Sequence, residues 1–172
     1  KKGEDIEQGS VILKAGQRLR PQELGLAASV GIPKLKVMGK LRVAVFSTGD
    51  EIYDPNDQAL TGTIFDSNRY SVMSMLEAMS CHVTDLGILP DDEDVITTAI
   101  ASASKKHHVV VTSGGVSAGE EDHVKAAVTR QGSLDFWRLA IKPGRPIALG
   151  RVDDAVFIGL PGNPVAAMVT FM

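Results

Sequence analysis

The sequence contains little cysteine, few aromatic residues and no long apolar run. Cys81 is the only cysteine among 172 residues, which excludes an internal disulfide framework and a cysteine-rich zinc finger. A single cysteine is typical of a reducing compartment, so we expect a cytoplasmic protein. No apolar run approaches the roughly 20 residues of a membrane-spanning helix, so we expect no membrane partner.

The sequence also lacks an excess of positive charge. Its 18 lysines and arginines against 21 acidic residues give a net charge of −3, so there is no general attraction to nucleic acid. An anionic ligand would therefore need a local basic site. At 44% hydrophobic and 23% charged residues, the composition is that of a folded globular protein rather than a disordered one.

Residues 1–38 differ from the rest because glycines and prolines interrupt short apolar pieces. They predict a short strand, a tight turn and a helix that begins near Pro21, since proline is favoured at a first helical position. This segment is too small to hold a core of its own. We expect it to be the remnant of a preceding N-terminal domain, with residues 39–172 as the main domain of a chain cut from something longer, before a C-terminal domain.

From Arg42 onward, strand-like and helix-like segments alternate. Val72, Met75, Leu76 and Met79 form the apolar stripe of an amphipathic helix, for example. Such alternation predicts an α/β protein, a mostly parallel sheet with helices on both faces. Ligands then lie beyond the carboxyl ends of the strands. The expected strands are residues 43–46, 82–89, 108–112, 134–141, 147–149 and 156–160.

Two acidic segments follow predicted strands. The first, Ser47–Glu51, offers hydroxyls, a glycine and two carboxylates, although the same residues favour an ordinary turn. The second is Pro90–Asp94, at the start of a predicted helix. Asp91 or Asp92 as a helix cap would explain most of this second cluster without any function. A metal site at Asp91 is the alternative.

A glycine-rich segment, Ser113–Asp122, follows another predicted strand. Its backbone N–H groups could surround a phosphate at a helix N-terminus. Glu120 and Glu121 stand where a P-loop has lysine and a hydroxyl residue, so an NTPase loop is excluded. Ser117 and Glu120 could equally form a capping box, but Asp122 has no such explanation.

A basic segment and a proline-bounded turn complete the strand ends. The basic segment, residues 136–146, places the only tryptophan beside Arg138, Lys142 and Arg145. Local positive charge next to an aromatic ring suits a phosphorylated flat heterocycle, and a solvated basic edge is the alternative. The turn Leu160–Val165 contains two prolines and a glycine before a helix, which could also be simple capping.

Together these segments closely resemble the molybdopterin molybdenumtransferase family, which includes bacterial MoeA and the E domain of gephyrin. The resemblance lies in FSTGDE, in DD after a strand, and in TSGGVSAGEED, AIKPGRP and GLPGNP, all in the family's order and spacing. GEDIEQG and LAASVGI resemble the end of the family's N-terminal region. The resemblance implies a three-layer α/β/α domain that binds adenylylated molybdopterin. It also implies Mg²⁺-dependent insertion of molybdate with release of AMP.

The resemblance also implies the site residues. The catalytic and Mg²⁺-binding acids fall on Glu51, Asp91 and Asp122. Arg138 replaces a lysine of some relatives, which keeps the charge but changes the hydrogen-bond geometry. The expected molybdopterin-binding residues are Thr48, Gly49, Ser113, Gly114, Gly115, Ser117, Gly119, Arg138, Lys142, Pro161, Gly162, Asn163 and Pro164.

Two other functions stay open at this point. One is a molybdopterin adenylyltransferase acting one step earlier, and the other is a non-catalytic scaffold domain of the gephyrin type. The GLPGNP and IKPGRP segments favour the molybdenumtransferase. The resemblance further implies a homodimer in the full-length protein and contact with the adenylyltransferase of the pathway. We expect the 172-residue chain by itself to bind its ligand without turnover.

Overall fold

The structure is a computed structural model that describes residues 5–58, 62–115, 123–138 and 146–172. The chain divides into two compact units, Lys1–Gly39 and Lys40–Met172. In the part of the chain that the structure describes, no helix is long and apolar enough to cross a membrane.

The first unit contains one helix, α1 (Pro21–Ser29). Pro21 occupies the first turn, as its fixed φ angle favours. The Glu23 carboxylate accepts the Arg20 backbone N–H at 2.8 Å and so holds the helix start. The predicted short strand is not formed within residues 5–39. Val11 is 78% exposed, and a lone extended segment without a neighbouring strand has no ladder of hydrogen bonds.

The second unit is built on a six-stranded sheet in the order β4-β1-β5-β8-β7-β6. The strands β4, β1, β5 and β8 are mutually parallel, and β7 and β6 continue the sheet in antiparallel fashion. The mostly parallel sheet predicted from the sequence is thus confirmed. The strand bounds are β1 Arg42–Thr48, β4 His82–Leu89, β5 Val109–Ser113, β6 Gly132–Arg138, β7 Pro146–Val152 and β8 Ala155–Leu160.

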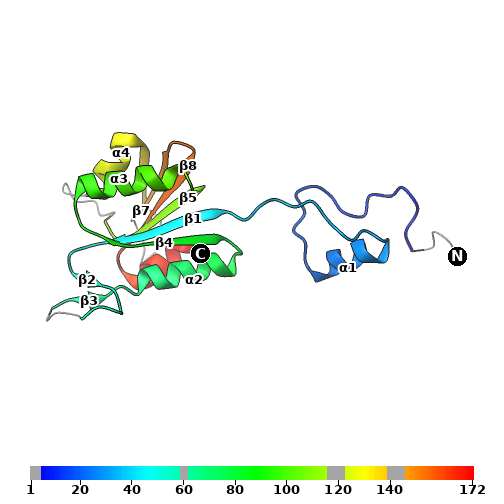
Figure 1. Ribbon diagram of the computed structural model, residues 1–172, viewed down its shortest axis with the longest axis horizontal. Coiled ribbons are helices and arrows are strands. Elements are labelled where there is room, and N and C mark those ends of the chain that lie inside the picture. Colours follow the sequence, from blue (N-terminus) through cyan, green and yellow to red (C-terminus); the bar gives the residue numbers. More distant parts are fainter. Residues whose placement is uncertain (1–4, 59–61, 116–122, 139–145) are drawn as a thin grey trace. The chain divides into compact units, whose positions relative to one another are not determined.

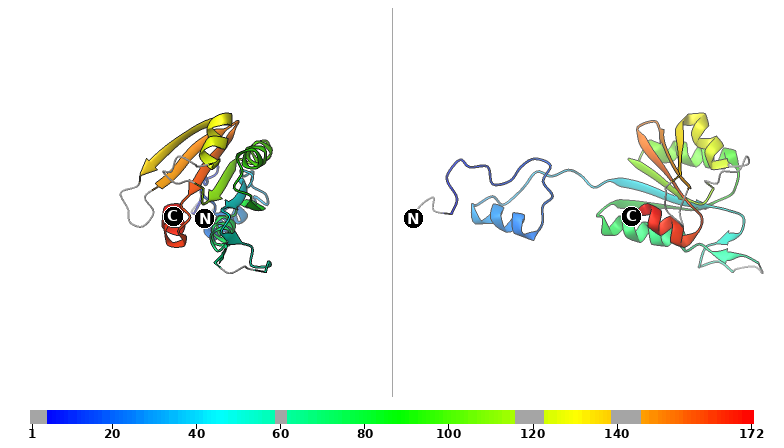
Figure 2. Two further views of the ribbon diagram at one scale, coloured as in Figure 1. Left: turned by 90° about the vertical axis from the view of Figure 1, so that its left-hand side faces the viewer. Right: turned by 180° about the vertical axis from the view of Figure 1, so that it is seen from behind.

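Helices cover both faces of this sheet, as Figures 1 and 2 show. One face carries α2 (Asn68–Ala78) and α5 (Pro164–Phe171), and the other carries α3 (Glu93–Ser104) and α4 (His123–Gln131). Two apolar cores result. Ile96, Ile100 and Val124 pack on the α3–α4 face, whereas Val72 and Leu76 pack on the α2–α5 face. The three-layer α/β/α architecture is therefore confirmed.

Two features of the second unit differ from the sequence predictions. The strand expected at residues 134–141 begins earlier, because β6 pairs with β7 from Gly132↔Val152 to Arg138↔Pro146. Between β1 and α2, where no strand was expected, the chain forms a small parallel ribbon, β2 (Ile52–Tyr53) with β3 (Ile64–Phe65). Strands of two residues are too short to show any periodicity.

Candidate functional site

The carboxyl ends of the central strands meet at one edge of the sheet. From β1 the chain crosses to β4 on one side and returns to β5 on the other, so the order reverses between β1 and β5. The register places Ser47 opposite Ser113 there, and Ser113 opposite Leu160 of β8. A reversal of strand order is where α/β sheets bind ligands. The structure thus brings the segments after β1, β5 and β8 together.

The glycine turn after β5 packs tightly against the end of β1. The Ser47 and Ser113 hydroxyls lie 2.9 Å apart in a buried contact, and the Gly114 N–H donates to the Leu160 carbonyl at 3.1 Å. Gly115 has a φ of +63°, and a Cβ there would lie 2.5 Å from Val124 Cγ2. Such an approach admits only glycine, so part of the glycine-rich segment is explained by packing.

The neighbouring acids Asp91 and Asp92 have different environments. The Asp92 carboxylate caps α3 by accepting the Val95 N–H at 2.9 Å. Asp91 is not the cap. Its Oδ1 accepts the Thr48 hydroxyl at 3.4 Å, which ties it to the end of β1. The cap in this cluster is therefore Asp92, and a metal-binding role for Asp91 stays a prediction.

The Glu51 carboxylate lies over the turn that follows β1. Gly49 has a φ of +147°, and a Cβ built there would be 3.0 Å from Glu51 Oε2. The turn thus brings this carboxylate close to Gly49, and Glu51 lines the strand-end pocket together with Thr48. A carboxylate in this position can bind a cation or a hydrogen-bond donor of a ligand.

A pocket of about 140 Å³ lies at this edge of the sheet. Its polar wall comes from the ends of β1 and β5, and an apolar wall comes from the β2–β3 ribbon. The start of α2 and the turn before α5 close it. The lining residues are Thr48, Glu51, Ile52, Ile64, Phe65, Asp66, Ser67, Asn68, Ser113, Gly114, Gly162 and Pro164.

The turn Pro161–Pro164 is held by two asparagines. Asn163 caps α5 by accepting the Ala166 N–H at 3.0 Å. Asn68, at the start of α2, donates its side-chain amide to the Gly162 carbonyl at 2.7 Å. Asn163 therefore has a structural role, and Asn68 is a pocket residue that sequence reasoning missed. A serine–asparagine pair at a helix start is typical of capping, so the sequence gives no separate signal for a pocket residue there.

Sequence reasoning also missed a buried cluster around Arg69. The Arg69 side chain is 2% exposed and pairs with Asp66 at 2.9 Å, and with Asp54 and Asp85. Burial lowers the pKa of Arg69, but the hydrogen bonds that it donates to three carboxylates outweigh this effect and hold the pKa above its usual value. Tyr70 donates its hydroxyl to Asp54 Oδ2 at 3.1 Å. Asp66 is three residues from Arg69, but Asp54 and Asp85 are 15 and 16 residues away, so spacing alone does not reveal the cluster.

Some predicted residues cannot be placed in this geometry. Ser117, Gly119, Asp122 and Lys142 lie outside the described residues. Arg138 ends β6, which runs in the same direction as β8, so its backbone lies at the same edge of the sheet. Within the described ranges, no group of three or more histidine, cysteine or acidic side chains could hold a metal ion.

A family comparison adds to this geometry. Residues 44–172 match the family model described as "Probable molybdopterin binding domain". The chain belongs to this family. The match begins within β1 and includes all of the strand ends that form the pocket.

Curated relatives of this molybdopterin-binding domain are similar over nearly the whole chain. A molybdopterin molybdenumtransferase of Haemophilus influenzae is 47% identical over 98% of this chain and 42% of the relative. A second, from Synechococcus elongatus, is 38% identical over 99% of this chain and 43% of the relative. The chain thus spans less than half the length of these curated relatives.

Two solved structures are also similar to this chain. The molybdopterin biosynthesis MoeA protein of Pyrococcus horikoshii matches with a TM-score of 0.82 and 32% identity, over 97% of this chain and 41% of that chain. The molybdopterin biosynthesis enzyme MoaB of Thermus thermophilus matches with a TM-score of 0.57 over 74% of this chain and 84% of that chain. Its identity is 15%, so it shows the fold alone.

Proposed function

We propose that this chain binds adenylylated molybdopterin and supplies the part of a molybdopterin molybdenumtransferase that inserts molybdate with release of AMP. The observation that carries the proposal is the strand-end pocket, where Glu51, Thr48 and Gly114 meet at the reversal of strand order. The names of the curated relatives support the same reaction.

Different residues would bind the phosphates, the ring and the cation, according to their chemistry. Backbone N–H groups of the glycine-rich segment and the positive charges of Arg138 and Lys142 would bind the phosphates. The pocket beside Ser113 and Gly114 would hold the ring. The carboxylates of Glu51, Asp91 and Asp122 would serve the cation and the reacting oxyanion. Glu51 lines the pocket, and Asp91 is tied by Thr48 to the end of the same strand.

The acidic residues fit Mg²⁺ by the chemistry of their ligand atoms. Mg²⁺ takes oxygen ligands and keeps several waters, so one or two carboxylates are enough to hold it at a phosphate substrate. Glu51 and Asp91 both adjoin the end of β1, and we propose that they would bind the ion together with Asp122. When bound, the ion would neutralise charge on the phosphoanhydride. Asp91 accepts the Thr48 hydroxyl and does not cap α3, which supports this assignment.

Oligomeric state, compartment and partner are also part of the proposed function. We propose that the full-length protein acts as a homodimer in the cytoplasm and receives its substrate from the adenylyltransferase of the pathway. The single cysteine supports the reducing compartment.

A titration of the chain with molybdopterin tests the proposal. Fluorescence of Trp137, the only tryptophan, reports binding. We expect the Arg138→Ala, Lys142→Ala double variant to bind at least tenfold more weakly, because two charge-assisted contacts to phosphate are lost. The matched control is Lys105→Ala, Lys106→Ala, which removes the same charge after α3 and should bind like the unaltered chain. Equal affinity of both double variants would refute the basic site.

A further inference from the structure

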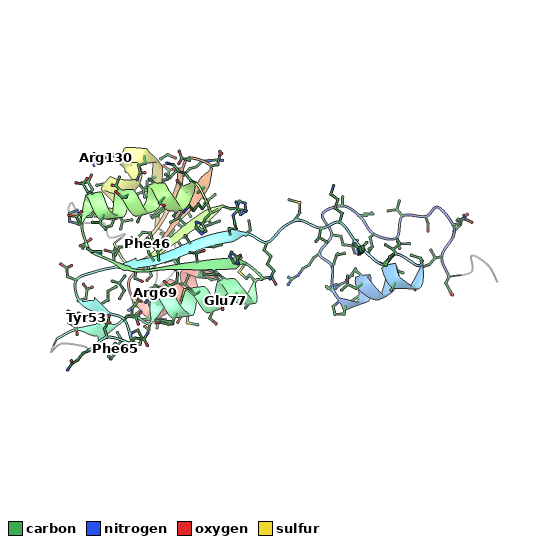
Figure 3. All side chains as sticks on the ribbon, viewed as in Figure 1. Phe46, Tyr53, Phe65, Arg69, Glu77 and Arg130 are labelled. Atoms are coloured by element: carbon green, nitrogen blue, oxygen red, sulfur yellow. The ribbon has the colours of Figure 1, made fainter. Side chains whose placement is uncertain are left out.

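The Arg69 side chain links the small ribbon β2–β3 to the main sheet. Asp54 comes directly after β2, and Asp66 comes directly after β3. Both carboxylates bind the Arg69 guanidinium, whose third partner, Asp85, belongs to β4 of the main sheet. Figure 3 shows Tyr53, Phe65 and Arg69 in the same region of the second unit. Because β2 and β3 are parallel, these two carboxylates lie at the same end of the ribbon, and the guanidinium fastens that end to the central sheet.

The ribbon carries the apolar wall of the pocket. Ile52, Ile64 and Phe65 line it opposite Thr48 and Ser113. Ile64 is 59% exposed and Phe65 is 52% exposed, so two large apolar residues that line the pocket are open to water. A cluster of exposed apolar side chains beside a pocket indicates a surface that a ligand covers.

We propose that Phe65 and Ile64 cover the flat ring of the bound pterin, and that Arg69 is the positioning residue that holds this wall over the pocket. This inference rests on the proposed function for the chemical class of the ligand. It assigns the β2–β3 ribbon the role of selecting a flat heterocycle, whereas the phosphates are bound elsewhere.

The chemistry of Arg69 suits this positioning role. Its planar fork donates in several fixed directions, so it can hold three carboxylates from three elements at once, which a lysine ammonium cannot do with the same geometry. Asp66 is 2% exposed, whereas Asp54 and Asp85 are 24% and 39% exposed. Within the ribbon, the Ile64 N–H donates to Glu51 O at 2.9 Å and the Asp66 N–H donates to Tyr53 O at 2.8 Å. Without the guanidinium, the ribbon would lose its ionic link to Asp85 of the central sheet.

Two measurements on the chain test the inference. Amide hydrogen exchange at Ile64 and Asp66 measures how firmly the ribbon is held. Titration with molybdopterin measures how much the apolar wall contributes to binding. We expect Arg69→Lys and Asp54→Asn to speed exchange at both amides but not in β5. The control Arg130→Lys changes an arginine paired with Glu93 and Asp94 on the α3–α4 face and should leave both amides unchanged.

A double-mutant cycle separates positioning from general loosening. We expect Phe65→Ala to weaken binding three- to tenfold, the range for loss of one aromatic contact. If Asp54 acts through the wall, Asp54→Asn weakens binding less in the Phe65→Ala background than in the parent, because part of the wall it positions is gone. Additive effects, or unchanged ribbon exchange in both Asp54→Asn and Arg69→Lys, would overturn the inference. Failure of the unaltered chain to bind molybdopterin would instead overturn the proposed function, and this inference with it.

Discussion

At the scale of single residues, variants of Asp91 and Asp92 can distinguish a helix-capping role from a role in the functional site. Asp92→Ala removes the cap of α3 and should lower the free energy of unfolding by about 1 kcal/mol, with binding intact. Asp91→Asn should leave the melting temperature nearly unchanged but abolish molybdate insertion in the full-length protein, because an amide is a poor cation ligand. Thermal melts and AMP release measure the two effects. An active Asp91→Asn enzyme would show that Asp91 is not part of the site.

Asp54 gives a prediction for the acid range. Hydrogen bonds from Asn56, opposed by desolvation and aided by Arg69 and Tyr70, lower the pKa of Asp54 from 3.8 to about 2. A lowered pKa in the folded state means that the carboxylate contributes stability above pH 4, and that this contribution is lost as the pH falls towards 2. Asp54→Asn should therefore reduce the difference in urea stability between pH 5 and pH 2.5. Asn56→Ala keeps the backbone donor, so it should reduce the difference less; the reverse ranking would contradict the assignment.

At the scale of elements, the turn after β5 depends on glycine for space as well as for backbone angle. Gly115→Ala would place a Cβ 2.5 Å from Val124 Cγ2 and 2.7 Å from Thr48 Cγ2, whereas Gly87→Ala meets no atom within 4 Å at a similar φ of +77°. Both substitutions carry backbone strain, but only the first also overpacks the core, at a further cost of about 1–3 kcal/mol. Urea unfolding of both variants measures the difference. Equal losses would mean that α4 shifts freely to make room.

The elements that could be predicted from the sequence are those with repeated apolar spacing. The stripe from Val72 to Met79 lies in and just after α2, and the β-branched run Val109–Val111 lies in the central strand β5. The ribbon β2–β3 could not be predicted, because two-residue strands carry no period. The Arg69 cluster was missed for another reason: its carboxylates come from separate elements that only the fold brings together.

At the scale of the whole molecule, one strand edge gathers residues from most of the second unit. The sequence places each candidate segment after a strand, and the structure shows that β1, β5 and β8 end at the same side of the sheet. Which residues pack and which line the pocket could be seen only in the structure. Gly115 is explained by its close approach to the Val124 and Thr48 side chains and Asn163 by capping, whereas Glu51 and Asn68 line the pocket.

The last prediction concerns how much of the reaction this chain performs. It spans 42% of the Haemophilus influenzae relative, and catalysis requires metal, oxyanion and anhydride to be held in fixed register with water excluded. We expect the 172-residue chain to bind molybdopterin more weakly than a full-length molybdenumtransferase and to release no AMP from the adenylylated form in the presence of molybdate. A side-by-side assay at equal site concentration measures both quantities. Comparable rates of AMP release would show that the strand-end residues of this domain suffice, because no further part of the enzyme would then be needed to align the reacting groups.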